Sequence, residues 1–95
     1  MTDWFVYILR CADDTLYTGV TTDTQRRVYQ HNNTKAGAAY TRARRPVVLE
    51  FQLACSSRST ALKTEYAIKQ LQRSQKLELI GGDSDLKQQV LADAT

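Results

Sequence analysis

The sequence contains few of the residues that define several classes of small protein. Its two cysteines, Cys11 and Cys55, lack metal-ligand or redox-pair spacing, which predicts free thiols in a reducing compartment. The longest apolar run, WFVYIL at 4–9, is too short to span a bilayer. It also lacks the basic start and small-residue exit of a signal peptide. We therefore expect a cytoplasmic protein without a membrane partner.

Acidic residues are scarce in the middle of the chain. Residues 26–76 contain eleven lysine and arginine side chains against Glu50 and Glu65, a net charge of +9, whereas the whole chain carries only +3. A segment this one-sided repels itself unless a polyanion is nearby, which makes nucleic acid the leading partner. A basic protein-binding face stays open as an alternative. An anionic membrane is disfavoured because no amphipathic helix with a lysine-rich edge is predicted.

The pattern of apolar and turn residues predicts an α+β domain. A chain of 95 residues has room for one domain with one modest core. Alternation and capping residues predict strands at 4–10, 16–20 and 47–54, a basic loop at 35–46, and helices from a cap at 21–23 to about 33, from a cap at 56–59 to about 73, at 74–80 and at 84–93. The order is ββαβα with a helical tail, which favours a small three-stranded antiparallel sheet flanked by helices.

The longest predicted helix carries a carboxylate within its apolar stripe. At about 100° per residue, Glu65 lies between Leu62 and Ile68. Burying an unpaired carboxylate is strongly unfavourable, so Glu65 must find a cation or hydrogen-bond donors. Lys69, one turn later, offers an ordinary ion pair. The alternative is that Glu65 is a metal ligand or an active-site carboxylate facing the sheet, and both interpretations stay open.

A second group of reactive side chains surrounds the predicted corner between the second strand and the first helix. Arg27 and His31 are four residues apart, so both project from one face of that helix. Tyr7 and Tyr17 lie in the paired strands, and Gly19, without a Cβ, leaves space for backbone or substrate beside Tyr17. Structural interpretations also exist: surface charge for the arginine, a satisfied histidine, core tyrosines and a glycine that ends a strand.

Taken together, the stretches VYIL, LYTG, RRVYQHN and ALKTEYAIKQL resemble the GIY-YIG nuclease superfamily. YTRARRP and RSQKLELI are similar to its small stand-alone bacterial branch. The resemblance covers roughly residues 4–80. It implies a GIY-YIG-like nuclease domain at 1–80, with a C-terminal helical tail at 81–95 that belongs to the same single domain.

By position, the resemblance implies six catalytic residues: Tyr7, Tyr17, Gly19, Arg27, His31 and Glu65. It implies a metal-dependent DNA endonuclease that hydrolyses phosphodiester bonds to 5′-phosphate and 3′-hydroxyl ends. Glu65 would hold the one divalent metal of the site, Mg²⁺ or Mn²⁺. The arginine–histidine pair resembles the structure-selective branch of the family, which indicates a role in DNA repair or recombination.

Elementary chemistry supports these residue types for the reaction. A metal can neutralise the leaving oxygen as a Lewis acid, and the guanidinium of Arg27 can meet the phosphate as its negative charge grows. A tyrosine of reference pKa about 10 accepts the proton of water only if cations depress its pKa, whereas a histidine titrates near neutrality. We therefore expect Tyr17 or His31 as the general base, with Tyr7 positioning water or phosphate.

The basic segment supplies the predicted contacts with DNA. Eight residues are expected to bind nucleic acid: Arg26, Lys35, Tyr40, Arg42, Arg44, Arg45, Lys69 and Arg73. The cations of the 35–46 loop are spaced for phosphates, and Tyr40 could stack on an unpaired base, unless it packs on the domain instead. Phosphate contacts are mostly sequence-neutral, so we expect weak base specificity and recognition of branched, nicked or single-stranded DNA.

Some motif positions depart from the family pattern. The first motif lacks its glycine and final tyrosine at Val6–Ile8, and Thr18 replaces an isoleucine. Val20 stands where some members have a lysine, whose role is then missing or supplied by a residue such as Arg26. These departures leave two alternatives open: a non-catalytic nucleic-acid-binding module on the same fold, and a protein-interaction domain that docks an acidic partner.

Overall fold

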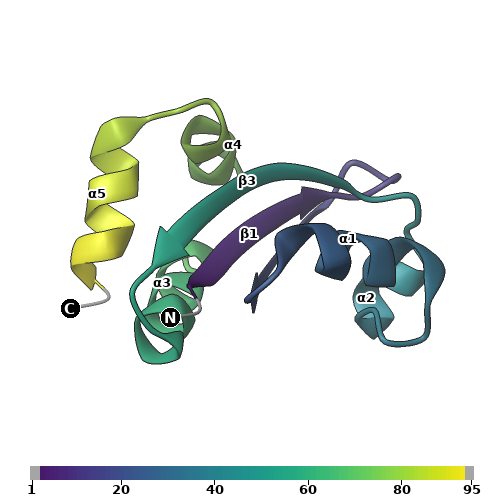
Figure 1. Ribbon diagram of the computed structural model, residues 1–95. Helices are drawn as coiled ribbons and strands as arrows, with labels where there is room; N and C mark the ends of the chain where they lie inside the picture. Colours follow the sequence, from purple (N-terminus) through teal and green to yellow (C-terminus); the bar gives the residue numbers. More distant parts are fainter. Residues whose placement is uncertain (1–2, 94–95) are drawn as a thin grey trace.

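The computed structural model describes residues 3–93 as a three-stranded sheet with five helices (Figure 1). The elements are β1 (Trp4–Arg10), β2 (Leu16–Thr21), α1 (Thr24–Asn33), α2 (Ala39–Arg42), β3 (Val48–Cys55), α3 (Arg58–Lys69), α4 (Arg73–Ile80) and α5 (Ser84–Asp93). This architecture confirms the predicted α+β class and the antiparallel sheet. Residues 1–2 of the predicted nuclease domain and residues 94–95 of the predicted C-terminal tail lie outside the described residues. Within residues 3–93, no helix has the length and apolar character needed to cross a membrane.

β1 is the central strand, with β2 and β3 paired antiparallel on its two sides. Successive side chains of a strand point to opposite faces, so Val6 and Ile8 face one way and Tyr7 and Leu9 the other. All four are at most 1% exposed. Helices therefore cover both faces of β1, which explains why this strand is apolar along its length instead of alternating with polar residues.

Two hydrophobic clusters, one on each face, hold the helices to the sheet. The larger cluster joins the Val6 face to α3, α4 and α5 through Ile68, Leu79 and Val90. The smaller cluster joins the Tyr7 face to α1, with Val28 packed against it. Figure 1 shows the result: α1 and α2 lie together at one end of the molecule, and α5 lies at the other.

Two details of the helices differ from the prediction. Residues 39–42 form α2, a single helical turn within the segment predicted as a loop, and one turn is too short to show a helical period. The helix predicted to reach about residue 73 ends at Lys69. The Gln72 backbone N–H bonds to the side-chain oxygen of Gln75 at 3.0 Å, and this reciprocal cap begins α4 at Arg73.

Candidate active site

The ring of Tyr7 lies across the partner strand at a position that has no side chain. Tyr7 of β1 is paired with Gly19 of β2. A Cβ on Gly19 would stand 2.5 Å from the Tyr7 hydroxyl oxygen, which is closer than any real contact of this kind. The space that Gly19 leaves open is therefore filled by the phenol of Tyr7.

His31 of α1 meets the same hydroxyl from the neighbouring helix. Its Nε2 lies 2.8 Å from the Tyr7 hydroxyl oxygen, and its Nδ1 lies 2.8 Å from the hydroxyl oxygen of Thr41. The imidazole is fully buried. Burial lowers the pKa of His31 to about 4, and the charges of Arg27 and Arg45 act in the same direction. The ring is therefore neutral at pH 7, with a hydrogen bond at each nitrogen.

Tyr17 of β2 completes an aromatic cluster beside the histidine. Its ring centroid lies 5.3 Å from that of His31 and 6.5 Å from that of Tyr7. Tyr17 is half-buried, whereas Tyr7 is 1% exposed. Of the two phenols, Tyr17 is therefore the one that reaches the surface.

Tyr40 of α2 extends this cluster. Its ring stacks on Tyr17 at a centroid distance of 6.0 Å, and the guanidinium of Arg44 lies 3.9 Å from its centroid. The ring of Tyr40 thus already has an aromatic and a cationic partner. This packing is the alternative to base stacking that the sequence left open.

Arg27 is held one turn before His31 on α1. Its Nη1 donates to the side-chain oxygen of Gln30 at 3.0 Å and to the carbonyl oxygen of Ala36 at 2.7 Å. Burial raises the pKa of Tyr7 to about 12, while Arg27 lowers it through a hydrogen bond and through its charge. The guanidinium therefore lies within reach of the Tyr7 hydroxyl. The contacts of Arg27 with Gln30 and Ala36 both use Nη1, so another nitrogen of the guanidinium can bind an anion.

Glu65 approaches from α3, which packs against β1 and β2. Its side chain is 19% exposed, and the Lys69 ammonium lies 3.5 Å from a carboxylate oxygen. The ion pair that the helix spacing offered is therefore present. The negative charge of Glu65 also raises the pKa of Tyr7, as the smallest of several influences. The carboxylate thus lies close enough for its charge to act on Tyr7.

The side chains near Tyr7 fit a hard divalent cation better than zinc. Among residues 3–93, no three histidine, cysteine or acidic side chains are grouped as a metal site. Zinc sites use three or four protein ligands, commonly nitrogen and sulfur. Mg²⁺ instead keeps several waters and takes one or two carboxylates together with phosphate oxygens. Glu65 could supply that carboxylate once Lys69 moves away.

Four of the predicted nucleic-acid contacts already have partners within the fold. Arg44 pairs with Asp13 at 3.0 Å, Arg73 with Asp14 at 3.1 Å, and Lys69 with Glu65, while Arg45 donates to the carbonyl oxygens of His31 and Thr34. Each of these cations must share or leave its partner before it can bind a phosphate.

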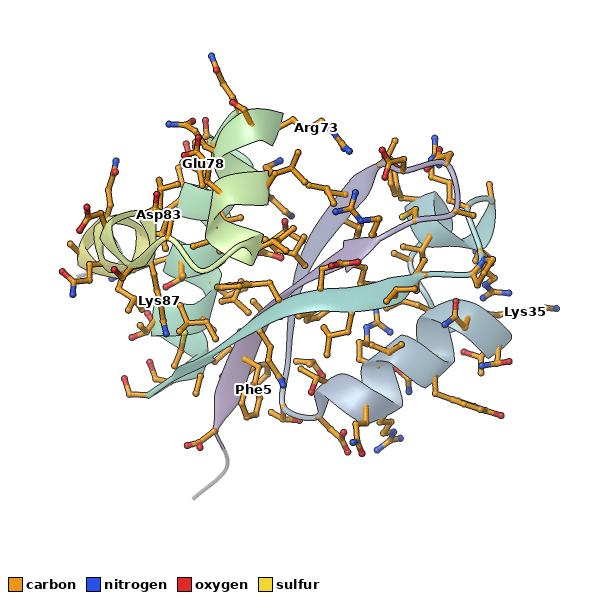
Figure 2. The ribbon with its side chains drawn as sticks, turned by 90° about the horizontal axis from the view of Figure 1, so that it is seen from above. Phe5, Lys35, Arg73, Glu78, Asp83 and Lys87 are labelled. Carbon is orange, nitrogen blue, oxygen red and sulfur yellow. The ribbon has the colours of Figure 1, made fainter. Side chains whose placement is uncertain are left out.

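Three other predicted contacts are free to bind an anion. Arg26, Lys35 and Arg42 are exposed, and no side-chain hydrogen bond or ion pair holds them within the described part of the chain. They lie on α1, just after it and on α2. Figure 2 shows Lys35 at the opposite end of the molecule from Asp83. These three cations therefore lie on or beside the helices that carry His31 and Tyr40.

Three residues that support the site were not predicted from the sequence, and for two of them the sequence carries no recognisable signal. Thr41 is fully buried and bonds to His31 across ten positions of the chain. A Cβ on Gly37 would stand 2.8 Å from the Cα of His31, so the loop after α1 can close only with glycine there. Gln30, which holds Arg27, is the exception, because its spacing of three residues places both on one helix face.

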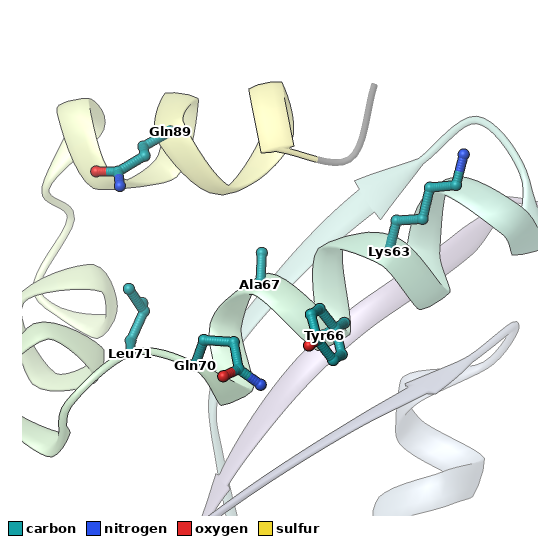
Figure 3. Close-up of a pocket in the computed structure, with 6 residues that line it drawn as sticks. All are labelled: Lys63, Tyr66, Ala67, Gln70, Leu71 and Gln89. Carbon is teal, nitrogen blue, oxygen red and sulfur yellow. The ribbon is translucent and has the colours of Figure 1, made fainter.

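A surface groove of about 500 Å³ lies elsewhere, between α3 and α5 (Figure 3). Its walls are Lys63, Tyr66, Ala67, Gln70, Leu71 and Gln89. The groove is lined by none of the six predicted catalytic residues, and it offers no carboxylate or imidazole. The chemistry is therefore better placed at the cluster around Tyr7.

Comparison with known proteins finds the family that the sequence motifs resemble. Residues 3–78 match the model of the GIY-YIG catalytic domain. A UPF0213 protein of Desulfotalea psychrophila is 56% identical over 77 residues, which are 81% of this chain and 70% of that relative. A UPF0213 protein of Staphylococcus haemolyticus is 50% identical over 80 residues, 84% of this chain and 96% of that relative.

Solved structures share the fold. The solution NMR structure of a UPF0213 protein from Bacillus halodurans has a TM-score of 0.54 at 40% identity, over 90% of this chain and 93% of the other. The solution NMR structure of a protein from E. faecalis has a TM-score of 0.59 at 38% identity, over 85% of each chain. The match to the GIY-YIG catalytic domain, over residues 3–78, includes all the elements that bring the cluster together.

Proposed function

This chain belongs to the GIY-YIG family of catalytic domains, and on that premise we propose that it is a divalent-metal-dependent DNA endonuclease. The observation that carries the proposal is the meeting of Tyr7, Tyr17, Arg27 and His31, from three elements, with the charge of Glu65 acting on the same hydroxyl. Binding nucleic acid requires surface cations, but it does not require a buried neutral histidine bonded to a phenol.

Arg27 stabilises charge in the proposed reaction. Attack of water forms a new bond to phosphorus and breaks the bond to the 3′-oxygen, which leaves a 5′-phosphate and a 3′-hydroxyl. Guanidinium N–H groups donate to a non-bridging oxygen as its negative charge grows. When bound to Glu65, Mg²⁺ or Mn²⁺ supplies Lewis acidity for the leaving oxygen.

Tyr17 is the better candidate for the general base. It is half-buried and reaches the surface. His31 has no exposed surface and both ring nitrogens are engaged, and a group whose pKa is lowered to about 4 is a weak base at neutral pH. We assign His31 the role of holding Tyr7, which positions the water or the phosphate.

The exposed cations favour a DNA substrate recognised by shape. Arg26, Lys35 and Arg42 would neutralise phosphates around the scissile bond, and such contacts do not distinguish sequences. Branched or nicked DNA is therefore the expected substrate, in repair or recombination. The free, buried thiols of Cys11 and Cys55 are consistent with action in the cytoplasm.

One observation favours a second candidate, a nucleic-acid-binding module without catalysis. The carboxylate of Glu65 is already paired with Lys69, as expected of a glutamate with a structural role. This candidate predicts salt-sensitive DNA binding without cleavage.

Nicking of supercoiled and branched DNA in Mg²⁺ or Mn²⁺ tests the proposal. We expect the purified Glu65→Gln and Arg27→Ala proteins to lose at least about 100-fold in rate, because each removes charge stabilisation of the transition state. Glu78→Gln is the matched control, because Glu78 is exposed on α4, far from the cluster (Figure 2). Cleavage that persists in Glu65→Gln contradicts the proposed site, and binding without cleavage by the wild-type protein favours the second candidate.

A further inference from the structure

Thr41 stands behind the histidine, on the side away from Tyr7. It lies in α2, is fully buried, and its hydroxyl has two neighbours. The oxygen is 2.8 Å from Nδ1 of His31 and 2.9 Å from the carbonyl oxygen of Ala38. These two contacts are of different kinds, because a carbonyl oxygen can only accept a hydrogen bond whereas a ring nitrogen can donate or accept.

The direction of each hydrogen bond follows from counting protons. The Thr41 hydroxyl has one proton, and it points at the carbonyl oxygen of Ala38, because two oxygens 2.9 Å apart would repel without a proton between them. The same carbonyl also accepts from the backbone N–H groups of Thr41 and Arg42. Toward His31 the hydroxyl can then only accept, so Nδ1 must carry a proton. A neutral imidazole has one N–H, which leaves Nε2 with a lone pair directed at Tyr7. Tyr7 must therefore donate to His31.

From this chain of contacts we infer that Thr41 is a positioning residue that sets the tautomer of His31 and, through it, the direction of the Tyr7 hydroxyl. The inference rests on the proposed nuclease function for its catalytic consequence. With its proton committed to His31, the Tyr7 oxygen presents only lone pairs to its other neighbours. It can then accept from Arg27 or from a water that approaches the phosphate.

The tautomer can be measured directly, because His31 is the only histidine in the chain. Long-range ¹H–¹⁵N NMR of the free protein, without metal or DNA, distinguishes a protonated from an unprotonated ring nitrogen. We expect the wild-type ring to be protonated at Nδ1. Thr41→Val removes the acceptor while keeping the shape, so a substantial fraction of the ring should move its proton to Nε2. Thr41→Ser restores the hydroxyl and should restore the wild-type spectrum.

The nicking assay supplies the second measurement. Thr41→Val should lower kcat by about 10-fold or more, the effect expected when a partner that orients a functional histidine is lost, with KM for DNA changed less than about twofold. Thr41→Ser should recover most of the rate. A merely structural threonine would affect the amount of folded protein but neither the tautomer nor kcat per folded molecule.

The outcomes separate this inference from the proposed function. A wild-type ring protonated at Nε2, or a Thr41→Val ring with the wild-type tautomer, overturns the positioning role whatever the nuclease assay gives. If Thr41→Val does not fold, the wild-type spectrum alone still decides whether Nδ1 of His31 carries the proton. A ring protonated at Nδ1 in a protein that cuts no DNA supports the tautomer assignment and overturns the nuclease proposal.

Discussion

Acidification should destabilise this fold through His31. The buried imidazole has its pKa lowered to about 4, against an ordinary value of 6.5 that the unfolded chain recovers. The neutral ring therefore contributes stability that is complete above pH 6.5 and is lost as the pH falls toward 4. The full effect corresponds to about 3 kcal/mol, of which about 2 kcal/mol is lost between pH 7 and pH 5. That is a large part of the stability of a small domain, about 5–15 kcal/mol.

Urea unfolding at pH 7, 6 and 5 measures this loss. The His31→Gln protein is the reference, because glutamine does not titrate yet can still accept a hydrogen bond from Tyr7. Asp13 and Asp14, whose pKa values are lowered mainly by hydrogen bonds from Thr15 and Arg10 respectively, titrate below this range and contribute equally to both proteins. We expect the free energy of unfolding to fall about 2 kcal/mol more in the wild type than in the variant. Parallel pH profiles, or an NMR titration of His31 near 6.5, would refute the argument.

Three further predictions follow from contacts of the site. Gly19→Ala should lower the free energy of unfolding by about 1–3 kcal/mol in urea titrations, because the new methyl group overlaps the phenol packed on it. Lys69→Met should tighten Mn²⁺ binding about two- to fivefold by electron paramagnetic resonance without DNA, since it frees Glu65 from a half-exposed ion pair. Arg45→Ala should destabilise the protein by about 1–3 kcal/mol by removing a donor from carbonyls at the end of α1. Arg26→Ala, the control for Arg45→Ala, should leave stability within about 0.5 kcal/mol and reduce the salt dependence of DNA binding by about one counterion.

Each prediction has a result that contradicts it. Gly81→Ala is the control for Gly19→Ala, because a Cβ at Gly81 meets its nearest neighbour at 3.4 Å, and equal losses in both variants would exclude overlap as the cause. Unchanged Mn²⁺ affinity in Lys69→Met would indicate that Glu65 does not bind the metal. If Arg45→Ala kept full stability and weakened DNA binding, its contacts with α1 would be incidental.

Much of the architecture could be predicted because local patterns specify it. The apolar run around Tyr7 predicted a strand, and the four-residue spacing of Arg27 and His31 placed both on one helix face, where they lie. For Glu65, the apolar stripe identified the residue and also offered Lys69 as its partner. Helical geometry therefore did not decide between the two interpretations.

The remainder depends on contacts between distant residues. Nothing in the sequence near Thr41 indicates that its hydroxyl meets His31, because that contact forms only when α2 folds back on α1. The partners of Arg44 and Arg73 are aspartates of the β1–β2 turn, 31 and 59 positions away. A count of charges along the chain predicts a basic segment, but it cannot tell which cations are neutralised by such pairs.

The pairing of Asp13 and Asp14 with arginines has a consequence for how the molecule meets DNA. It cancels positive charge near the hairpin turn and leaves Arg26, Lys35 and Arg42 uncompensated on α1, just after it and on α2. A phosphate backbone would attract these cations before contact, and the rate of productive encounter should fall steeply with ionic strength.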